Sequence, residues 1–127
     1  MQAVKRWTDF LDTSGSGFKM GDCYQNAAEF QMEKPEFEGS TVWLCHGEVM
    51  HSEKHFYHGH AWLEWGDCAG LVIDPSTGKP EALFVPAPMY YKLGKINPET
   101  IKRFTVDETR ENLVKTECWG PWEDQND

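Results

Sequence analysis

The sequence lacks a long hydrophobic run. No apolar stretch approaches the roughly 20 residues that a membrane-spanning helix needs, and the N-terminal residues show no pattern of a secretory signal. We therefore expect a cytoplasmic protein without a membrane partner.

Basic residues are also scarce. The chain carries 12 Lys and Arg against 21 Asp and Glu, so its formal net charge is −9. A surface that binds nucleic acid or an anionic membrane needs clustered positive charge. The charge balance therefore argues against nucleic-acid partners as well.

Cysteine is sparse, and no two cysteines have the C-x-x-C spacing. The 4 cysteines, Cys23, Cys45, Cys68 and Cys118, lie far apart. An even number of cysteines allows disulfides, but a reducing cytosol favours free thiols. We interpret Cys45, Cys68 and Cys118 as structural or incidental thiols.

Aromatic residues, by contrast, are abundant. They make up 13% of the 127 residues, with 6 Trp and 7 Phe, which is enough to build one core. A chain of this length suits a single domain, here residues 1–127. The expected order is helix, helix, several antiparallel strands and a final helix. This order is typical of an α+β domain in which N-terminal helices pack on one antiparallel sheet.

Apolar periodicity and turn residues predict the individual elements. They are a helix at 4–12, a loop at 13–17, a helix from Cys23, a strand at 40–50, a polar connection at 51–58, strands from His60 and at 71–74, an edge strand at 81–85, a helical turn at 89–94, a strand at 101–106, and a helix capped by Asp107 or Thr109 that ends near Cys118.

The helix from Cys23 places a cysteine in a first helical turn. Asp22 is a suitable N-cap, and Pro35 ends the helix at the latest. Cys23, Ala27 and Phe30 follow helical spacing, so we expect the cysteine on the core-facing side.

Residues 59–75 predict a hairpin with a histidine and an aspartate at neighbouring strand ends. In the first strand His60, Trp62 and Glu64 alternate with apolar residues and share one face. The second strand ends at Asp74, which Pro75 biases toward an extended conformation. In an antiparallel pair the start of one strand lies beside the end of its partner. We therefore expect the imidazole beside the carboxylate.

Cys23, His60 and Asp74 supply one candidate for each part of a thiol active site. Backbone N–H groups at a helix N-terminus stabilise a thiolate. A histidine moves protons, and a carboxylate behind its ring fixes the ring orientation. The backbone N–H of Cys23 is a natural oxyanion donor. A second donor or substrate-binding group stays open among Gln25, Asn26 and Trp62.

The order of these segments resembles the transglutaminase-like branch of the papain-like cysteine protease superfamily. The matching segments are 21–23 with 26–28, then 60–64 and 72–75, so the resemblance covers about residues 20 to 76. Small phage and bacterial proteins are similar in these segments. The resemblance implies a papain-like or transglutaminase-like core.

The resemblance also implies a thiol-dependent acyl transfer on a protein or peptide: hydrolysis of an amide, deamidation or transamidation. Cys23 would be the nucleophile, His60 the general base and acid, and Asp74 the residue that orients His60. Such an enzyme needs no cofactor. Because the superfamily includes inactive members, the alternative is a phage or bacterial binding module that acts on a host protein.

A second alternative is a zinc site. All 5 histidines, His46, His51, His55, His58 and His60, fall within 15 residues that follow Cys45. Zinc accepts imidazole and thiolate readily, but no spacing here matches a familiar zinc module, so we assign no metal ligand.

The remaining acidic and aromatic candidates receive simpler interpretations. Glu48 and Glu64 are weak alternatives for acid–base roles, and we interpret both as solvent-facing or rim carboxylates. Trp119 and Trp122 are expected to anchor the C-terminal tail.

Overall fold

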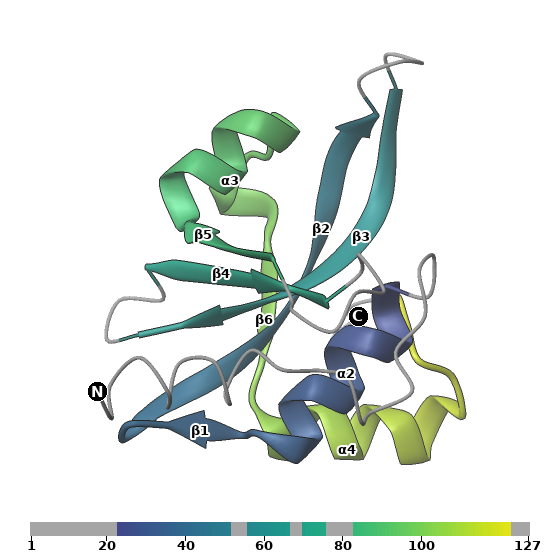
Figure 1. Cartoon of the computed structure of the whole chain (residues 1–127). Coiled ribbons are helices and arrows are strands. Elements are labelled where there is room, and N and C mark those ends of the chain that lie inside the picture. The colour runs from purple at the N-terminus through teal and green to yellow at the C-terminus, as the bar shows by residue number, and fades with distance from the viewer. Residues whose placement is uncertain (1–22, 52–55, 67–69, 76–82, 123–127) are drawn as a thin grey trace.

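A computed structural model describes residues 23–51, 56–66, 70–75 and 83–122 of the chain (Figure 1). The predicted helix at 4–12, the loop after it, the Asp22 cap and Cys68 lie outside these residues. The described residues form an α+β fold of helices and an antiparallel sheet, as the order of elements predicts.

The sheet has the strand order β1-β2-β3-β4-β5, and β6 pairs with β2. Every pairing between these strands is antiparallel. The elements are α2 (Cys23–Glu33), β1 (Glu36–Phe37), β2 (Ser40–His51), β3 (Phe56–Trp65), β4 (Leu71–Asp74), β5 (Leu83–Pro86), α3 (Ala87–Gly94), a 3-10 turn (Pro98–Thr100), β6 (Lys102–Phe104) and α4 (Val106–Thr116).

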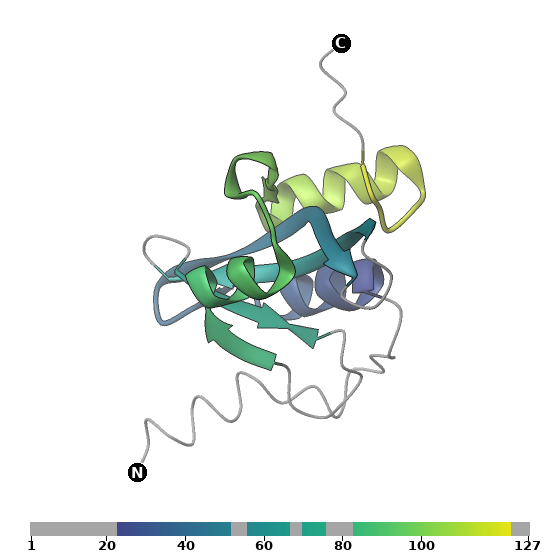
Figure 2. The same cartoon turned by 90° about the horizontal axis from the view of Figure 1, so that it is seen from above.

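The helices cover opposite faces of the sheet. Figures 1 and 2 show α3 on one face and α2 with α4 on the other. Each face has its own hydrophobic cluster, because successive strand residues point to opposite sides. The cluster under α2 includes Phe30, Leu44, Ala61, Leu63 and Trp65. The cluster under α3 includes Cys45, Trp62, Val72 and Tyr90. The predicted alternation of residues 60–65 is confirmed.

The prediction of a polar connection over residues 51–58 is wrong at residues 51 and 56–58, which belong to strands, whereas residues 52–55 lie outside the described residues. Strand β2 continues to His51, β3 begins at Phe56, and these two residues are paired. Backbone hydrogen bonds of a two-stranded ladder do not require apolar side chains, so a polar hairpin end still pairs. Tyr57, which is 48% exposed, lies in this solvent-facing part of the hairpin.

The expected cap of the final helix is also wrong, because the cap is Thr105, which precedes both Asp107 and Thr109. The Thr105 side chain accepts a hydrogen bond from the Glu108 backbone N–H at 3.2 Å, and the Glu108 carboxylate accepts one from the Thr105 N–H at 2.9 Å. This reciprocal pattern is a capping box. Since Thr105 leaves the strand to cap the helix, β6 is shorter than the predicted 101–106, and α4 ends at Thr116 rather than near Cys118.

Residues 86–88 join β5 to α3. The predicted edge strand ends at Pro86, and α3 begins at Ala87, two residues before the predicted helical turn. Pro88 lies in the first turn of the helix, where a missing N–H removes no intrahelical hydrogen bond. The segment that breaks the strand therefore also starts the helix.

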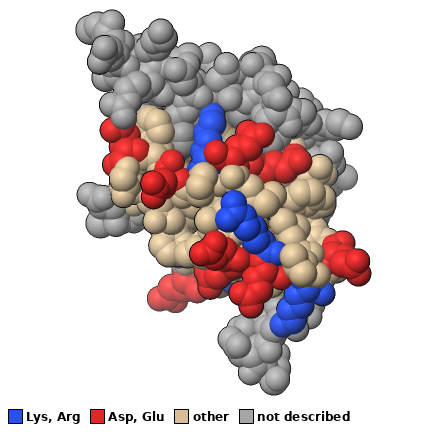
Figure 3. Space-filling view, turned by 90° about the horizontal axis from the view of Figure 1, so that it is seen from below, with Lys and Arg blue, Asp and Glu red and all other residues tan. Residues whose placement is uncertain are grey.

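Acidic side chains are prominent on the face seen in Figure 3, with Lys and Arg side chains between them. On α4 the exposed acids are Asp107, Glu108 and Glu111. Among the described helices, none is long and apolar enough to cross a membrane.

Candidate active site

Cys23 and His60 approach each other at an edge of β3. Strand β4 pairs with β3 only at residues 63–65, so along the described residues the earlier part of this β3 edge has no β4 partner. Cys23 is the first residue of α2, and its sulfur accepts a hydrogen bond from the Ala61 backbone N–H at this edge. Cys23 lies on the α2 face of the sheet and the His60 side chain points toward the α3 face. The two side chains therefore come into contact past the unpaired edge of β3.

Asp74 lies directly behind the His60 ring. The distance from His60 Nε2 to Asp74 Oδ2 is 3.0 Å, and the two side chains are 15% and 8% exposed. The Trp62 ring stacks beside the imidazole with centroids 6.1 Å apart. The structure therefore brings the predicted imidazole and carboxylate together, with Asp74 at the end of β4 but with His60 in the middle of β3 rather than near its start, because β3 already begins at Phe56. Because Nε2 is bonded to Asp74, Nδ1 is the ring nitrogen left for Cys23.

The pKa values of Cys23 and His60 shift in opposite directions. Burial alone raises the pKa of the thiol, but the hydrogen bond and charge of His60 outweigh burial and lower it below its usual value. Burial alone lowers the pKa of His60, but hydrogen bonds to Asp74 and Cys23 outweigh burial and raise it to about 9. These opposite shifts favour a thiolate–imidazolium pair near neutral pH.

Tyr90 is a member of the site that sequence reasoning missed. Its hydroxyl, carried on α3, donates a hydrogen bond to Asp74 Oδ2 at 2.7 Å. Burial and the neighbouring Asp74 raise the pKa of Tyr90, so the phenol keeps its proton and remains a donor. The sequence predicted a helical turn here, but nothing in it indicated which tyrosine would reach Asp74.

Glu64 is not the rim carboxylate that the sequence suggested. It is 0% exposed and accepts hydrogen bonds from Arg103 Nε at 2.9 Å, Trp62 Nε1 at 3.0 Å and the Tyr91 hydroxyl. A carboxylate is tolerated in a core when its oxygens are paired in this way. Since the Trp62 N–H donates to Glu64 and the indole is 0% exposed, Trp62 packs rather than serving as an oxyanion donor.

Gln25 and Asn26 follow Cys23 in the first turns of α2. Gln25 is half-buried, and Asn26 is buried at 2% exposure. Glu48 is exposed, as expected. The roles of Gln25 and Asn26 toward a substrate stay predictions, as does the oxyanion role of the Cys23 N–H.

The histidines do not gather around one point. Within the described part of the chain, no group of three or more His, Cys, Asp or Glu side chains could hold a metal ion. The rings of His58 and His60 have centroids 6.3 Å apart, whereas His46 packs on the opposite face with Phe104. The His51 and His55 side chains lie outside the described residues.

The three described cysteines, Cys23, Cys45 and Cys118, are free thiols. Cys45 is fully buried, and burial raises the pKa of its thiol, which makes it unreactive. Cys118 is exposed at the end of α4. Cys23 alone of these three combines partial exposure with a histidine partner.

Comparisons with known proteins identify no family for this chain. No family model matches it, and neither a curated protein nor a solved structure matches it.

Proposed function

We propose that the protein is a thiol-dependent acyl-transfer enzyme with a transglutaminase-like, papain-like core. Its substrate is an amide of a protein or peptide. The observation that carries the proposal is the unbroken chain of contacts from Cys23 through His60 to Asp74, with a thiol pKa that is lowered and an imidazole pKa that is raised.

Each of the three residues has a defined role in the reaction. The Cys23 thiolate attacks the carbonyl carbon of the amide, and the new C–S bond forms as the carbonyl oxygen takes the negative charge. The C–N bond then breaks, and His60 gives its proton to the departing amine. Water or a second amine, deprotonated by His60, attacks the thioester and releases Cys23. Asp74 holds the ring and stabilises its positive charge throughout.

The position of Cys23 supports this assignment. As the first residue of α2, it offers a backbone N–H that has no acceptor within the helix. Such an N–H is a donor for the oxyanion, and the helix dipole favours negative charge at the same place. The thiol is half-buried, so it has access to solvent without being fully solvated.

The first test is alkylation by iodoacetamide, followed by mass spectrometry of each cysteine from about pH 5 to pH 9. An ordinary thiol, with a pKa near 8.5, reacts little at the acid end. We expect Cys23 to react strongly at about pH 6, and His60→Gln to remove this advantage because the imidazolium is lost. Cys118, an exposed thiol in the same chain, is the internal reference.

A second assay asks about acyl transfer directly. An activated acetyl ester should add one acetyl group to Cys23 in the wild-type chain and none at that position in Cys23→Ala. Circular dichroism of each variant confirms that it is folded. Equal reactivity of Cys23 and Cys118 across the pH range, with no acetyl group on Cys23, would rule out the proposed enzyme.

A further inference from the structure

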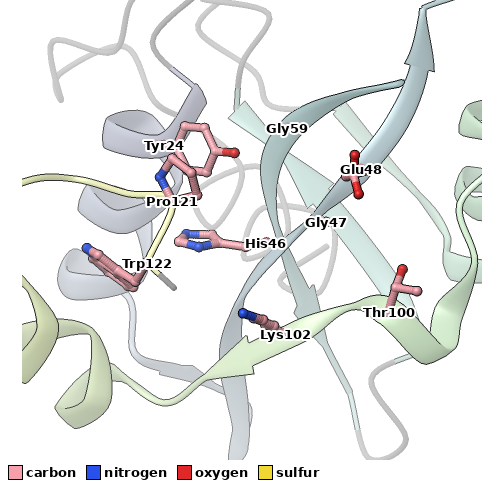
Figure 4. Close-up of a pocket in the computed structure, with 9 residues that line it drawn as sticks. All are labelled: Tyr24, His46, Gly47, Glu48, Gly59, Thr100, Lys102, Pro121 and Trp122. Atoms are coloured by element: carbon pink, nitrogen blue, oxygen red, sulfur yellow. The ribbon is translucent and has the colours of Figure 1, made fainter. Parts of the chain in front are cut away.

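The tyrosine that directly follows the nucleophile carries its hydroxyl toward the strand of the general base. Tyr24 is half-buried in the first turn of α2, and its ring packs edge-on against His46 with centroids 4.9 Å apart. The hydroxyl lies over the backbone of Gly59, where an added Cβ would collide with it. Figure 4 shows Tyr24 above His46, with its oxygen on the side of β3.

This hydroxyl is an unused hydrogen-bond donor. Among the described residues, the other three tyrosines, Tyr57, Tyr90 and Tyr91, each donate a hydrogen bond, whereas the Tyr24 hydroxyl has no partner. Burial, followed by the charges of Cys23 and Glu48, raises the pKa of Tyr24 to about 12. The phenol therefore keeps its proton at neutral pH and can donate to an incoming group.

The hydroxyl and the Cys23 sulfur lie against the same strand, two residues apart. The sulfur accepts a hydrogen bond from the Ala61 N–H, and the hydroxyl lies over Gly59. Alternate residues of a strand face the same side and are about 6.6 Å apart. A carbonyl carbon bonded to sulfur, its oxygen, and a hydrogen bond of about 2.9 Å together bridge a gap of this order.

A substrate can reach the hydroxyl from solvent. Tyr24 and Gly59 line a hollow on the α2 face with a volume of about 340 Å³, which is within the range of small-ligand pockets (Figure 4). Gly59 and Glu48, which also lines the hollow, are exposed. The donor is therefore both near the thiol and open to a bound group.

Other side chains near the thiol are less suitable as the second oxyanion donor. The Trp62 N–H is already bonded to Glu64, and Asn26 is buried at 2% exposure with partners of its own. Gln25 is half-buried and is the remaining rival. An oxyanion needs donors aimed at the place where its charge develops.

We propose that the Tyr24 hydroxyl is the second oxyanion donor, acting beside the Cys23 backbone N–H. As the C–S bond forms, the electron pair of the carbonyl double bond moves to oxygen, and that oxygen accepts hydrogen bonds from both donors. Tyr24 keeps its proton throughout. When the C–N bond breaks, the carbonyl forms again and the charge leaves the oxygen. This role rests on the proposed acyl-transfer function.

The test compares two reactions of Cys23 in Tyr24→Phe, which keeps the ring and removes only the hydroxyl. Acetylation by p-nitrophenyl acetate passes through an oxyanion, so its rate at Cys23 should fall about 100-fold. Alkylation by iodoacetamide displaces iodide at a saturated carbon and forms no oxyanion, so its rate should change less than about 2-fold. Mass spectrometry reads Cys23 and the reference thiol Cys118 separately.

Tyr57→Phe is the matched control, because Tyr57 is 48% exposed and its hydroxyl donates to the Lys95 carbonyl. Both reaction rates at Cys23 should stay at the wild-type values in this variant. Circular dichroism confirms that each variant is folded.

Gly59→Ala tests the position of the hydroxyl without removing it. The added Cβ collides with the Tyr24 hydroxyl but lies 3.6 Å from Tyr24 Cζ, which is an ordinary contact. Gly59→Ala should therefore slow acetylation in the chain that keeps Tyr24. In the Tyr24→Phe chain it should add less than about 3-fold, because the hydroxyl that it displaces is already gone.

Three results would overturn this role of Tyr24. They are acetylation of Tyr24→Phe at the wild-type rate, alkylation that falls by the same factor as acetylation, and a large loss in Gly59→Ala that is equal with and without the hydroxyl. A loss of acetylation in Gln25→Met but not in Tyr24→Phe would assign the donor to Gln25 instead. Each of these outcomes leaves the enzyme proposal standing, whereas a wild-type Cys23 that takes no acetyl group rejects both.

Discussion

Asp74 receives two hydrogen bonds on one carboxylate oxygen, from His60 at 3.0 Å and from Tyr90 at 2.7 Å. The first bond orients the imidazole, and the second fixes the carboxylate that does so. Asp74 is 5% exposed, and a buried carboxylate needs such partners. The orientation of His60 therefore depends on a residue from α3 as well as on its own hairpin.

The effect of Asp74 on His60 predicts a pH-dependent stability. The stability should be measured in a Cys23→Ala background. In the wild-type chain the thiol can pass its proton to the imidazole, and this transfer takes up no proton from the solvent, so it would hide the titration of His60. Burial lowers the pKa of His60, whereas the hydrogen bonds and charges of Asp74 and Cys23 together raise it to about 9. Without Cys23, Asp74 is the remaining group of these two that raises it. A pKa raised on folding contributes stability that is fully present below pH 6.5 and is lost as the pH rises through the folded-state pKa.

We therefore expect Cys23→Ala to be more stable than Cys23→Ala with Asp74→Asn by about 1 to 2 kcal/mol at pH 6. The difference should shrink by about pH 9.5, where the ring is neutral in both folded and unfolded chains. Urea denaturation at the two pH values measures it. A difference that stays constant with pH would contradict the charged pair.

At the scale of elements, one buried side chain ties four of them together. Gln31 of α2 is 0% exposed, and its amide N–H groups donate to the Val42 carbonyl of β2 at 3.0 Å and to the Phe104 carbonyl of β6 at 2.8 Å. Its amide oxygen accepts from the Thr109 hydroxyl of α4. This amide holds α2, and with it Cys23, in register with the sheet.

Gln31→Met keeps the length of the side chain but removes all of these hydrogen bonds. We expect a loss of about 2 to 4 kcal/mol in the free energy of unfolding, because buried polar groups lose partners. The matched control is Glu33→Met, which introduces the same side chain at an exposed position of the same helix. That change should stay within about 0.5 kcal/mol. Equal effects in urea denaturation would contradict the role of Gln31.

At the scale of the whole molecule, a buried ion pair links strands that are not neighbours. Arg103 of β6 and Glu64 of β3 are 2.9 Å apart across β2, and Arg103 also donates to the Tyr91 hydroxyl of α3 at 3.1 Å. The sheet and α3 are therefore joined by charge as well as by apolar contact.

Arg103→Met should destabilise the protein by about 2 to 4 kcal/mol, because it leaves the buried Glu64 carboxylate without its cation. The Arg103 side chain is 34% exposed, so the cost stays below that of a fully buried pair. Arg110→Met is the control, since Arg110 is 57% exposed and its pair with Asp107 is 3.7 Å long. That change should cost under about 1 kcal/mol. Chemical denaturation that ranks the two variants equally would contradict the buried pair.

Local patterns accounted for much of the fold and for the hairpin of the site. The alternation of polar and apolar residues predicted that His60 and Trp62 share one face of the strand. Pro75 predicted that the next strand ends at Asp74. Local patterns failed where two signals competed. The polar residues near His51 indicated a loop, although β2 and β3 remain paired as far as His51 and Phe56. Asp107 is a suitable N-cap residue by type, but Thr105 and Glu108 form the capping box of α4.

The sequence by itself determined a helix from Cys23, the central parts of β2, β3, β4 and β6, and the two faces of β3, because helical and strand periods are local properties. Only the tertiary structure decided that Cys23 and His60 meet around an open edge of β3, that Tyr90 bonds Asp74, and that Glu64 and His46 are buried. Those facts depend on where β4 stops pairing and on which helix covers each face. Contacts between distant parts of the chain set both, and no local pattern encodes them.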